Sequence, residues 1–324
     1  MIKLPKYIEY LSIADMSDRI IKNLQKFPHD VDLIVGIPRS GMLPANMLAL
    51  YMNKPFTDID SFIEGRIYSS GERGRFIDTN TKKRVIVVDD SYLTGNALVK
   101  AKKKLEPIAD KYELIFAVVF TSSRGKKAVD VWCEIVDSPR IFQWNIFHHK
   151  PIIGQSCMDI DGVLCQNPPV DDDGEKYIEY ITHAIPYIIP TVEIDTLVSC
   201  RLEKYRPQTE AWLAANNVKY RNLIMLDMPS KEERIKWGKH GEYKGSIYKR
   251  SSNILFIESS LAEANEICRV SGKMVFCTEN FELLYKHRNL NKKGQKIIGL
   301  IYKYLIKPFK KGKNDKQRLL LNNK

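Results

Sequence analysis

Two pairs of closely spaced carboxylates follow apolar, strand-like runs in the sequence. Asp89 and Asp90 are adjacent, and Asp159 and Asp161 are separated by one residue. Neighbouring carboxylates disfavour each other's ionised forms, so packing alone gives no reason to keep such pairs where buried strands end. Each pair is therefore a candidate site of chemistry.

The segment after Asp90 has the composition of a phosphate-binding loop. In open α/β sheets, ligands bind at the carboxyl ends of strands, where helix N-termini offer backbone N–H groups. The Thr94 hydroxyl and free N–H groups there would bind a phosphate, while Asp89 and Asp90 would bind vicinal hydroxyls, directly or through a metal ion. Together they predict a phosphorylated sugar as the ligand. The loop consists of Ser91, Tyr92, Leu93, Thr94, Gly95, Asn96 and Ala97.

The second pair predicts phosphate chemistry of another kind. In an extended strand, Asp159 and Asp161 lie on the same pleat face, and Gly162 then permits a sharp turn. One carboxylate can attack a phosphorus atom while the other exchanges a proton with the leaving oxygen. Mg²⁺ would offset the repulsion between them.

The elements that must position these residues alternate between strand and helix patterns. This alternation predicts an α/β fold with two open, mostly parallel sheets. We expect a first domain over residues 1–150, a second over 151–285 and a tail over 286–324. Strands are expected at 31–37, 84–90 and 112–120, then at 156–162, 195–200, 222–227, 253–259 and 273–277, with helices such as 41–53 and 95–112 between them.

The stretch "VIVVDDSYLTGNAL" resembles the signature of the type I phosphoribosyltransferases. The resemblance implies that Asp89 and Asp90 bind the ribose hydroxyls of phosphoribosyl pyrophosphate. Residues 91–97 would cradle its 5-phosphate, with Thr94 and Gly95 at the best-matched positions. Two departures stand out. Leu93 replaces the acidic residue that handles the base in purine salvage, which argues against that branch, and Ala97 replaces a frequent phosphate-binding Thr.

Two further segments carry the same resemblance. In "GIPRSG", the family binds pyrophosphate, with charge and backbone amides supplied here by Arg39, Ser40 and Gly41. The segment "EGRIYSSGERGRF" resembles the mobile loop that closes over pyrophosphate, and its candidates are Arg66, Arg73 and Arg75.

The element "DIDG" resembles the first motif of the haloacid-dehalogenase-like phosphatases. The resemblance implies that Asp159 is the nucleophile, Asp161 the acid/base, and Ser199 the phosphate-binding hydroxyl. Glu258 would bind Mg²⁺ together with both aspartates, although Glu-Ser-Ser departs from the commoner paired acids. The 29 residues from 166 to 194 are short for a large cap, which predicts an open site. For the phosphate-neutralising lysine we choose Lys244, with Lys231, Lys236 and Lys249 as competitors.

The net charge of +12 belongs to the tail. Residues 286–324 hold 11 Lys and 2 Arg against one Asp, which accounts for the whole excess. In "KIIGLIYKYLIKPFKKGK", helical spacing places Lys296, Lys303, Lys307 and Lys310 on one face and apolar residues over much of the rest. Such a segment can lie on an anionic membrane or pack on the core. Both interpretations stay open.

The compartment follows from features that the sequence lacks. The N-terminus shows no secretory signal, no stretch reaches transmembrane length, and the six scattered cysteines form no close zinc-like pairs. We expect a cytoplasmic protein, peripheral on the inner face of the cytoplasmic membrane.

The pairing of the two domains resembles proteins of bacterial surface-polysaccharide synthesis that add ribofuranose to lipid-linked glycans. The implied function is phosphoribosyl transfer to a sugar hydroxyl, followed by removal of the 5-phosphate. A nucleotide-metabolism enzyme with both activities and a non-catalytic sensor of phosphoribosyl pyrophosphate are alternatives. Nucleic acid is not an expected partner, because only the tail is basic.

Overall fold

The structure is a computed structural model that describes residues 8–68, 83–168 and 173–285. The chain divides into two compact units, Met1–His149 and Lys150–Lys324, which we describe separately. Arg73 and Arg75 and the basic tail lie outside the described residues. None of the helices in the described ranges combines the length and hydropathy needed to span a bilayer.

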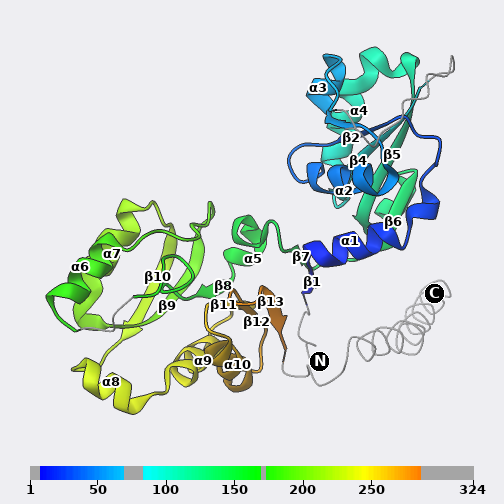
Figure 1. Cartoon of the computed structure of the whole chain (residues 1–324). Helices are drawn as coiled ribbons and strands as arrows, with labels where there is room; N and C mark the ends of the chain where they lie inside the picture. Colours follow the sequence, from blue (N-terminus) through cyan, green and yellow to red (C-terminus); the bar gives the residue numbers. More distant parts are fainter. Residues whose placement is uncertain (1–7, 69–82, 169–172, 286–324) are drawn as a thin grey trace, which may run out of the picture. The chain divides into compact units, whose positions relative to one another are not determined.

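The first unit contains a five-stranded parallel sheet in the order β3-β2-β4-β5-β6 (Figure 1). Alternate residues of β4 point to opposite faces: Ile86 and Val88 pack with α1 and α2, and Val85 and Val87 pack with α3 and α4. The strands are β2 (Leu33–Gly36), β3 (Phe56–Asp58), β4 (Lys83–Ser91), β5 (Tyr112–Thr121) and β6 (Val131–Ile135), and the helices are α1 (Ile13–Ile21), α2 (Met42–Met52), α3 (Ile59–Ile63) and α4 (Asn96–Leu105).

A separate two-stranded parallel sheet joins the ends of this unit. It pairs β1 (Glu9–Leu11) with β7 (Arg140–Phe142). The helix expected over 95–112 is shorter than predicted, because α4 ends at Leu105 and a 3₁₀ segment containing Pro107 follows. Proline removes a backbone donor and breaks the helical hydrogen-bond pattern.

The second unit contains a six-stranded sheet in the order β10-β9-β8-β11-β12-β13, parallel except for β13. Helices α9 and α10 pack on one cluster with Cys157, Val198 and Phe256, and α6 contributes to a second cluster with Leu202 and Met225. The elements are β8 (Ser156–Met158), β9 (Ile194–Leu202), β10 (Tyr220–Leu226), β11 (Leu255–Glu258), β12 (Val275–Cys277), β13 (Glu282–Leu284), α5 (Lys150–Ile153), α6 (Glu175–His183), α7 (Arg206–Ala215), α8 (Lys231–Trp237), α9 (His240–Arg250) and α10 (Leu261–Ser271).

The predicted fold class, α/β with open and mostly parallel sheets, is confirmed. In each unit the chain order of the strands reverses at one point. In the first unit this is between β2 and β4, and in the second between β8 and β11. Ligands of open α/β sheets bind at such switch points, beyond the carboxyl ends of the strands. Both carboxylate pairs lie at these two points.

Candidate functional sites

The Asp89–Asp90 pair is buried at the end of β4. The two residues are 7% and 5% exposed, and the backbone N–H of Asp90 donates to Asp89 Oδ1 at 2.8 Å. Burial, together with the charge of Asp90, raises the pKa of Asp89 to about 8. Hydroxyl donors of a bound ligand would stabilise the ionised form of these carboxylates.

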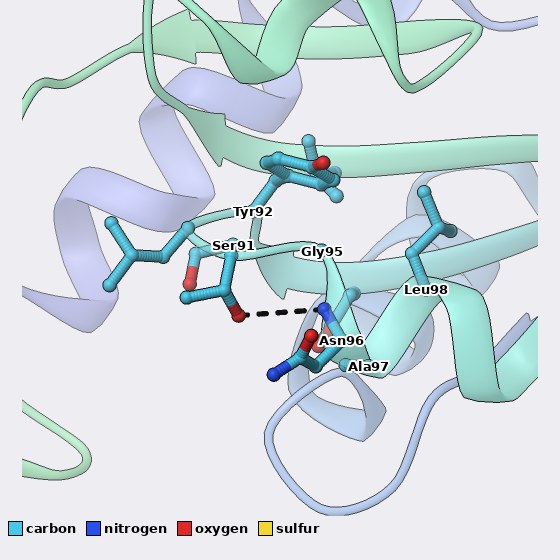
Figure 2. Close-up of a pocket in the computed structure, with 10 residues that line it drawn as sticks. Ser91, Tyr92, Gly95, Asn96, Ala97 and Leu98 are labelled. Atoms are coloured by element: carbon cyan, nitrogen blue, oxygen red, sulfur yellow. Dashed lines mark hydrogen bonds between the residues drawn. The ribbon is translucent and has the colours of Figure 1, made fainter.

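The phosphate-loop candidates run from the last residue of β4, Ser91, through the loop to the first turn of α4, and they line a small cavity of about 140 Å³. Gly95 precedes α4 with φ +83, a backbone conformation that favours glycine. A Cβ on Gly95 would lie 2.5 Å from the Tyr92 hydroxyl, and one on Gly125 would lie 2.3 Å from the Tyr92 ring, so the ring packs closely on both glycines. Figure 2 shows Tyr92 and Gly95 in this loop.

The first turn of α4 supplies the donors that a phosphate needs. Asn96 and Ala97, which were counted both in the phosphate loop and in the expected helix, are the first residues of the helix, and both are exposed. The Asn96 N–H donates weakly to Thr94 Oγ1, at 3.5 Å (Figure 2). The first N–H groups of a helix have no intrahelical acceptor, so they can bind an anion. Leu93 is 56% exposed at the edge of the loop.

The predicted pyrophosphate segment meets the acid pair across the switch point. Ser40 Oγ donates to Asp90 Oδ1 at 3.0 Å. A Cβ on Gly41 would lie 2.7 Å from Val88 O and 2.9 Å from Asp89 Oδ1, so only glycine allows this approach. Arg39 is exposed beside them, and the Pro38–Arg39 peptide bond is cis.

Of the three candidate loop arginines, Arg66 is the one within the described residues. Arg66 is exposed after α3 and pairs with Glu64 at 2.6 Å. The structure therefore brings together Asp89, Asp90, Ser40 and Gly41.

The second unit places Lys244 at the centre of three carboxylates. Lys244 Nζ donates to Asp159 Oδ2 at 2.7 Å, to Glu258 Oε2 at 2.8 Å and to Glu263 Oε2 at 2.7 Å. Burial opposes the charge of Lys244, but these carboxylates raise the pKa of its ammonium well above the usual value. Burial raises the pKa of Asp159 well above its ordinary range, although Lys244 acts in the other direction. Lys236 and Lys249 are exposed, and Lys231 is half-buried.

The carboxylate of Asp161 is held by a different cation. Arg201 donates to it from Nε at 3.0 Å and from Nη2 at 2.7 Å. Burial favours the protonated form of Asp161, but the Arg201 guanidinium outweighs it and lowers the pKa. Ser199 is 1% exposed, and its Oγ accepts the backbone N–H of Arg201 at 3.2 Å.

The reason given for pairing Asp159 with Asp161 was wrong in its geometry. Strand β8 ends at Met158, so neither aspartate shares its pleat. A turn brings both to one cavity of about 460 Å³. Gly162 has φ +74 within this turn, and a Cβ there would lie 2.4 Å from Ser259 Oγ.

The carboxylates of the second unit are the candidate ligands of Mg²⁺. Asp159 and Glu258 each direct one carboxylate oxygen at the same Lys244 nitrogen, so these oxygens converge. Mg²⁺ is commonly held by one or two carboxylates, with waters and phosphate oxygens completing the shell. The two residues fit that role, while Asp161 is engaged by Arg201. In the described ranges, no three His, Cys, Asp or Glu side chains are grouped to hold a metal. Asp159 and Glu258 would hold Mg²⁺, which would offset the negative charge of a phosphate.

Four residues of these sites were not predicted. Trp144 Nε1 donates to Asp90 Oδ2 at 2.7 Å, and Arg201 and Glu263 make the contacts above. His240 Nδ1 lies 3.6 Å from Glu263 Oε1. Two of the four carried a sequence signal: Arg201 interrupts an apolar strand, and Glu263 stands five residues after Glu258.

Comparison with known proteins finds similarity over part of the chain. Residues 8–152 match the family model of the phosphoribosyl transferase domain. The transcriptional regulator GfcR 2 of Methanosarcina acetivorans is 27% identical over 131 residues, 40% of this chain and 61% of that protein. GfcR of Methanosarcina mazei is 26% identical over 125 residues, 38% of this chain and 60% of that protein. The chain thus spans about three-fifths of these relatives.

Two solved structures are also similar to part of this chain. A xanthine-guanine-hypoxanthine phosphoribosyltransferase of Helicobacter pylori is 18% identical with a TM-score of 0.33, covering 44% of this chain and 94% of that one. A purine phosphoribosyltransferase of Pyrococcus horikoshii is 22% identical with a TM-score of 0.32, covering 42% and 92%. Residues 8–152 are thus similar to the phosphoribosyl transferase domain family, over somewhat less than half of the chain.

Proposed function

We propose that the chain is a bifunctional enzyme. Its first domain transfers 5-phosphoribosyl from phosphoribosyl pyrophosphate to a sugar hydroxyl of a polyprenyl-linked glycan. Its second domain then removes the 5-phosphate and leaves a ribofuranosyl residue. The observation that carries this proposal is the presence of two different buried acid clusters, one at each switch point: Asp89–Asp90 in one unit and Asp159 with Glu258 in the other.

The first step is positioning and charge control. Asp89 and Asp90 would accept hydrogen bonds from the ribose hydroxyls, and the N-terminus of α4 would bind the 5-phosphate. Ser40 and Gly41 bring the pyrophosphate segment beside this pair. Leu93 supports an acceptor other than a purine, since no acid stands at this position to hold a base nitrogen.

The second step requires a nucleophile and a cation beside it. Asp159 would attack phosphorus and form a phosphoaspartyl enzyme, releasing the ribosyl hydroxyl, and water would then cleave that intermediate. Lys244 is positioned to neutralise the transferred phosphate, because it already contacts Asp159. Asp161 would exchange the proton with the leaving oxygen only if its pair with Arg201 opened. Ser199, buried within β9 three residues before its end, would bind the phosphate oxygens.

Product masses test both steps. The chain is incubated with phosphoribosyl pyrophosphate, Mg²⁺ and polyprenyl-linked sugars. The wild type should yield a product heavier by one pentose, and Asp159→Asn should accumulate that product with one additional phosphate. A variant that yields only the dephosphorylated riboside would exclude the second domain as the phosphatase. No pentose addition to any acceptor would refute the transfer step.

A sensor of phosphoribosyl pyrophosphate is the second candidate. It is favoured by one observation: the curated relatives are named as transcriptional regulators. Tight binding of phosphoribosyl pyrophosphate without its turnover, in the presence of all acceptors, would support this candidate over the enzyme.

A further inference from the structure

The indole of Trp144 makes an unexplained contact with the acid pair. Its Nε1–H donates to Asp90 Oδ2 at 2.7 Å, while Ser40 Oγ donates to Oδ1 at 3.0 Å. Each oxygen of this buried carboxylate therefore has one protein donor. A carboxylate offers about four acceptor positions, so Asp90 is fixed in orientation and retains capacity for a ligand.

Trp144 is itself held rigidly by the two-stranded sheet. Its ring stacks on Phe142 of β7, with centroids 4.7 Å apart and planes 10° apart. The preceding residue, Gln143, donates its backbone N–H to Leu11 O at 2.9 Å and accepts the Ile13 N–H on its side chain at 2.8 Å. The indole is thus anchored to both β1 and α1.

The same strand also holds the phosphate loop. Arg140 of β7 is 6% exposed, and its Nη2 donates to the Tyr92 carbonyl at 2.8 Å. Two side chains at or just after β7 therefore reach the acid pair and the loop that follows it. Through these two hydrogen bonds, the two-stranded sheet contacts the edge of the five-stranded sheet where the ligand is expected to bind.

We infer that Trp144 is a positioning residue, which orients Asp90 to receive the ribose diol of phosphoribosyl pyrophosphate. This inference rests on the proposed function of the first site. When the diol binds, Asp90 shares its lone pairs between the ligand and the indole N–H. The electronic environment of Trp144 then changes with occupancy of the site.

The test compares Trp144→Phe with Trp132→Phe as a matched control. Trp132 is a half-buried tryptophan of the same unit, and its ring lies under Lys26. Loss of one hydrogen bond to a charged group should weaken binding of phosphoribosyl pyrophosphate with Mg²⁺ by roughly 10- to 100-fold. We expect KM to rise by that factor in Trp144→Phe, with kcat changed much less. The ligand-induced change in tryptophan fluorescence should vanish in Trp144→Phe and persist in Trp132→Phe.

A second measurement uses the wild-type protein, so it tests the inference even if Trp144→Phe does not fold. In wild-type protein labelled with ¹⁵N-tryptophan, one indole N–H resonance should shift on adding phosphoribosyl pyrophosphate, and Asp90→Asn should move the same resonance. Wild type that binds the ligand with no indole shift, or Trp144→Phe with unchanged affinity, would overturn the inference. Wild type that does not bind phosphoribosyl pyrophosphate would instead remove the proposed function on which it rests.

Discussion

Replacing Lys244 with Met should strongly destabilise the second unit and leave the first unaffected. The side chains of Lys244, Asp159 and Glu258 are 4%, 7% and 1% exposed, so water cannot replace the lost ammonium. Glu263 is 27% exposed and contributes less, since solvent screens it. Removing one partner from a buried ion pair costs about 3–5 kcal/mol. We expect a loss in that range, because the three contacts share one cation and do not add independently.

The chain provides its own probes for this experiment. Cys133 is the only cysteine of residues 1–149, and Cys157 lies buried in β8 of the second unit. Pulsed thiol labelling across a urea titration, with peptide mapping, measures the unfolding free energy of each unit separately. Lys249→Met is the matched control, since Lys249 is exposed on the same helix, and surface changes usually alter stability by under about 0.5 kcal/mol.

The pH dependence gives a second, independent check. Lys244 lowers the pKa of Asp159, so its removal should raise that already elevated pKa further. A carboxyl with a raised folded-state pKa binds more protons folded than unfolded, so stability falls as pH rises. The penalty of Lys244→Met should therefore be smaller at pH 6 than at pH 8. Equal stability of Lys244→Met and Lys249→Met, or a penalty that grows on acidification, would refute the reasoning.

Three further predictions concern other parts of the chain. In the wild type, the stability of the first unit should fall between pH 4 and 8, because the pKa of Asp89 is about 8 in the folded protein and ordinarily 3.8. Asp89→Asn should remove this fall. Cys133 labelling measures the stability, and an unchanged pH slope would contradict the prediction. Lys273→Met should cost the second unit about 1–3 kcal/mol, because Nζ donates to three carbonyls, of Tyr248, Ser251 and Asn253; a urea midpoint equal to that of the wild type would disprove it. Deleting residues 292–324 should release the protein from anionic liposomes, since lysines near such a surface contribute about 1 kcal/mol each, while transfer to a soluble acceptor continues. Sedimentation that survives the deletion would reject the membrane role.

Local patterns were enough to predict the α/β class and the positions of its main strands along the chain. The β-branched run before Asp89 and the apolar runs before Asp159 and Glu258 form β4, β8 and β11. Parallel strands need long crossovers, so alternating strand and helix patterns constrain the topology. Ligands of such sheets bind beyond the carboxyl ends of the strands, so carboxylates that directly follow these runs could be expected at the ligand-binding edge.

Only the tertiary structure decided which side chains meet there. Lys244 was one of four lysines with similar sequence surroundings, and the packing of α9 beside β11 brought its nitrogen between Asp159 and Glu258. Trp144 reaches Asp90 across 54 positions of sequence, through the pairing of β1 with β7 that no periodicity indicated. Such contacts depend on how distant elements pack, whereas periodicity and turn chemistry act within a few residues. The sequence therefore predicted where the strands lie, but not the partners of the charged residues that follow them.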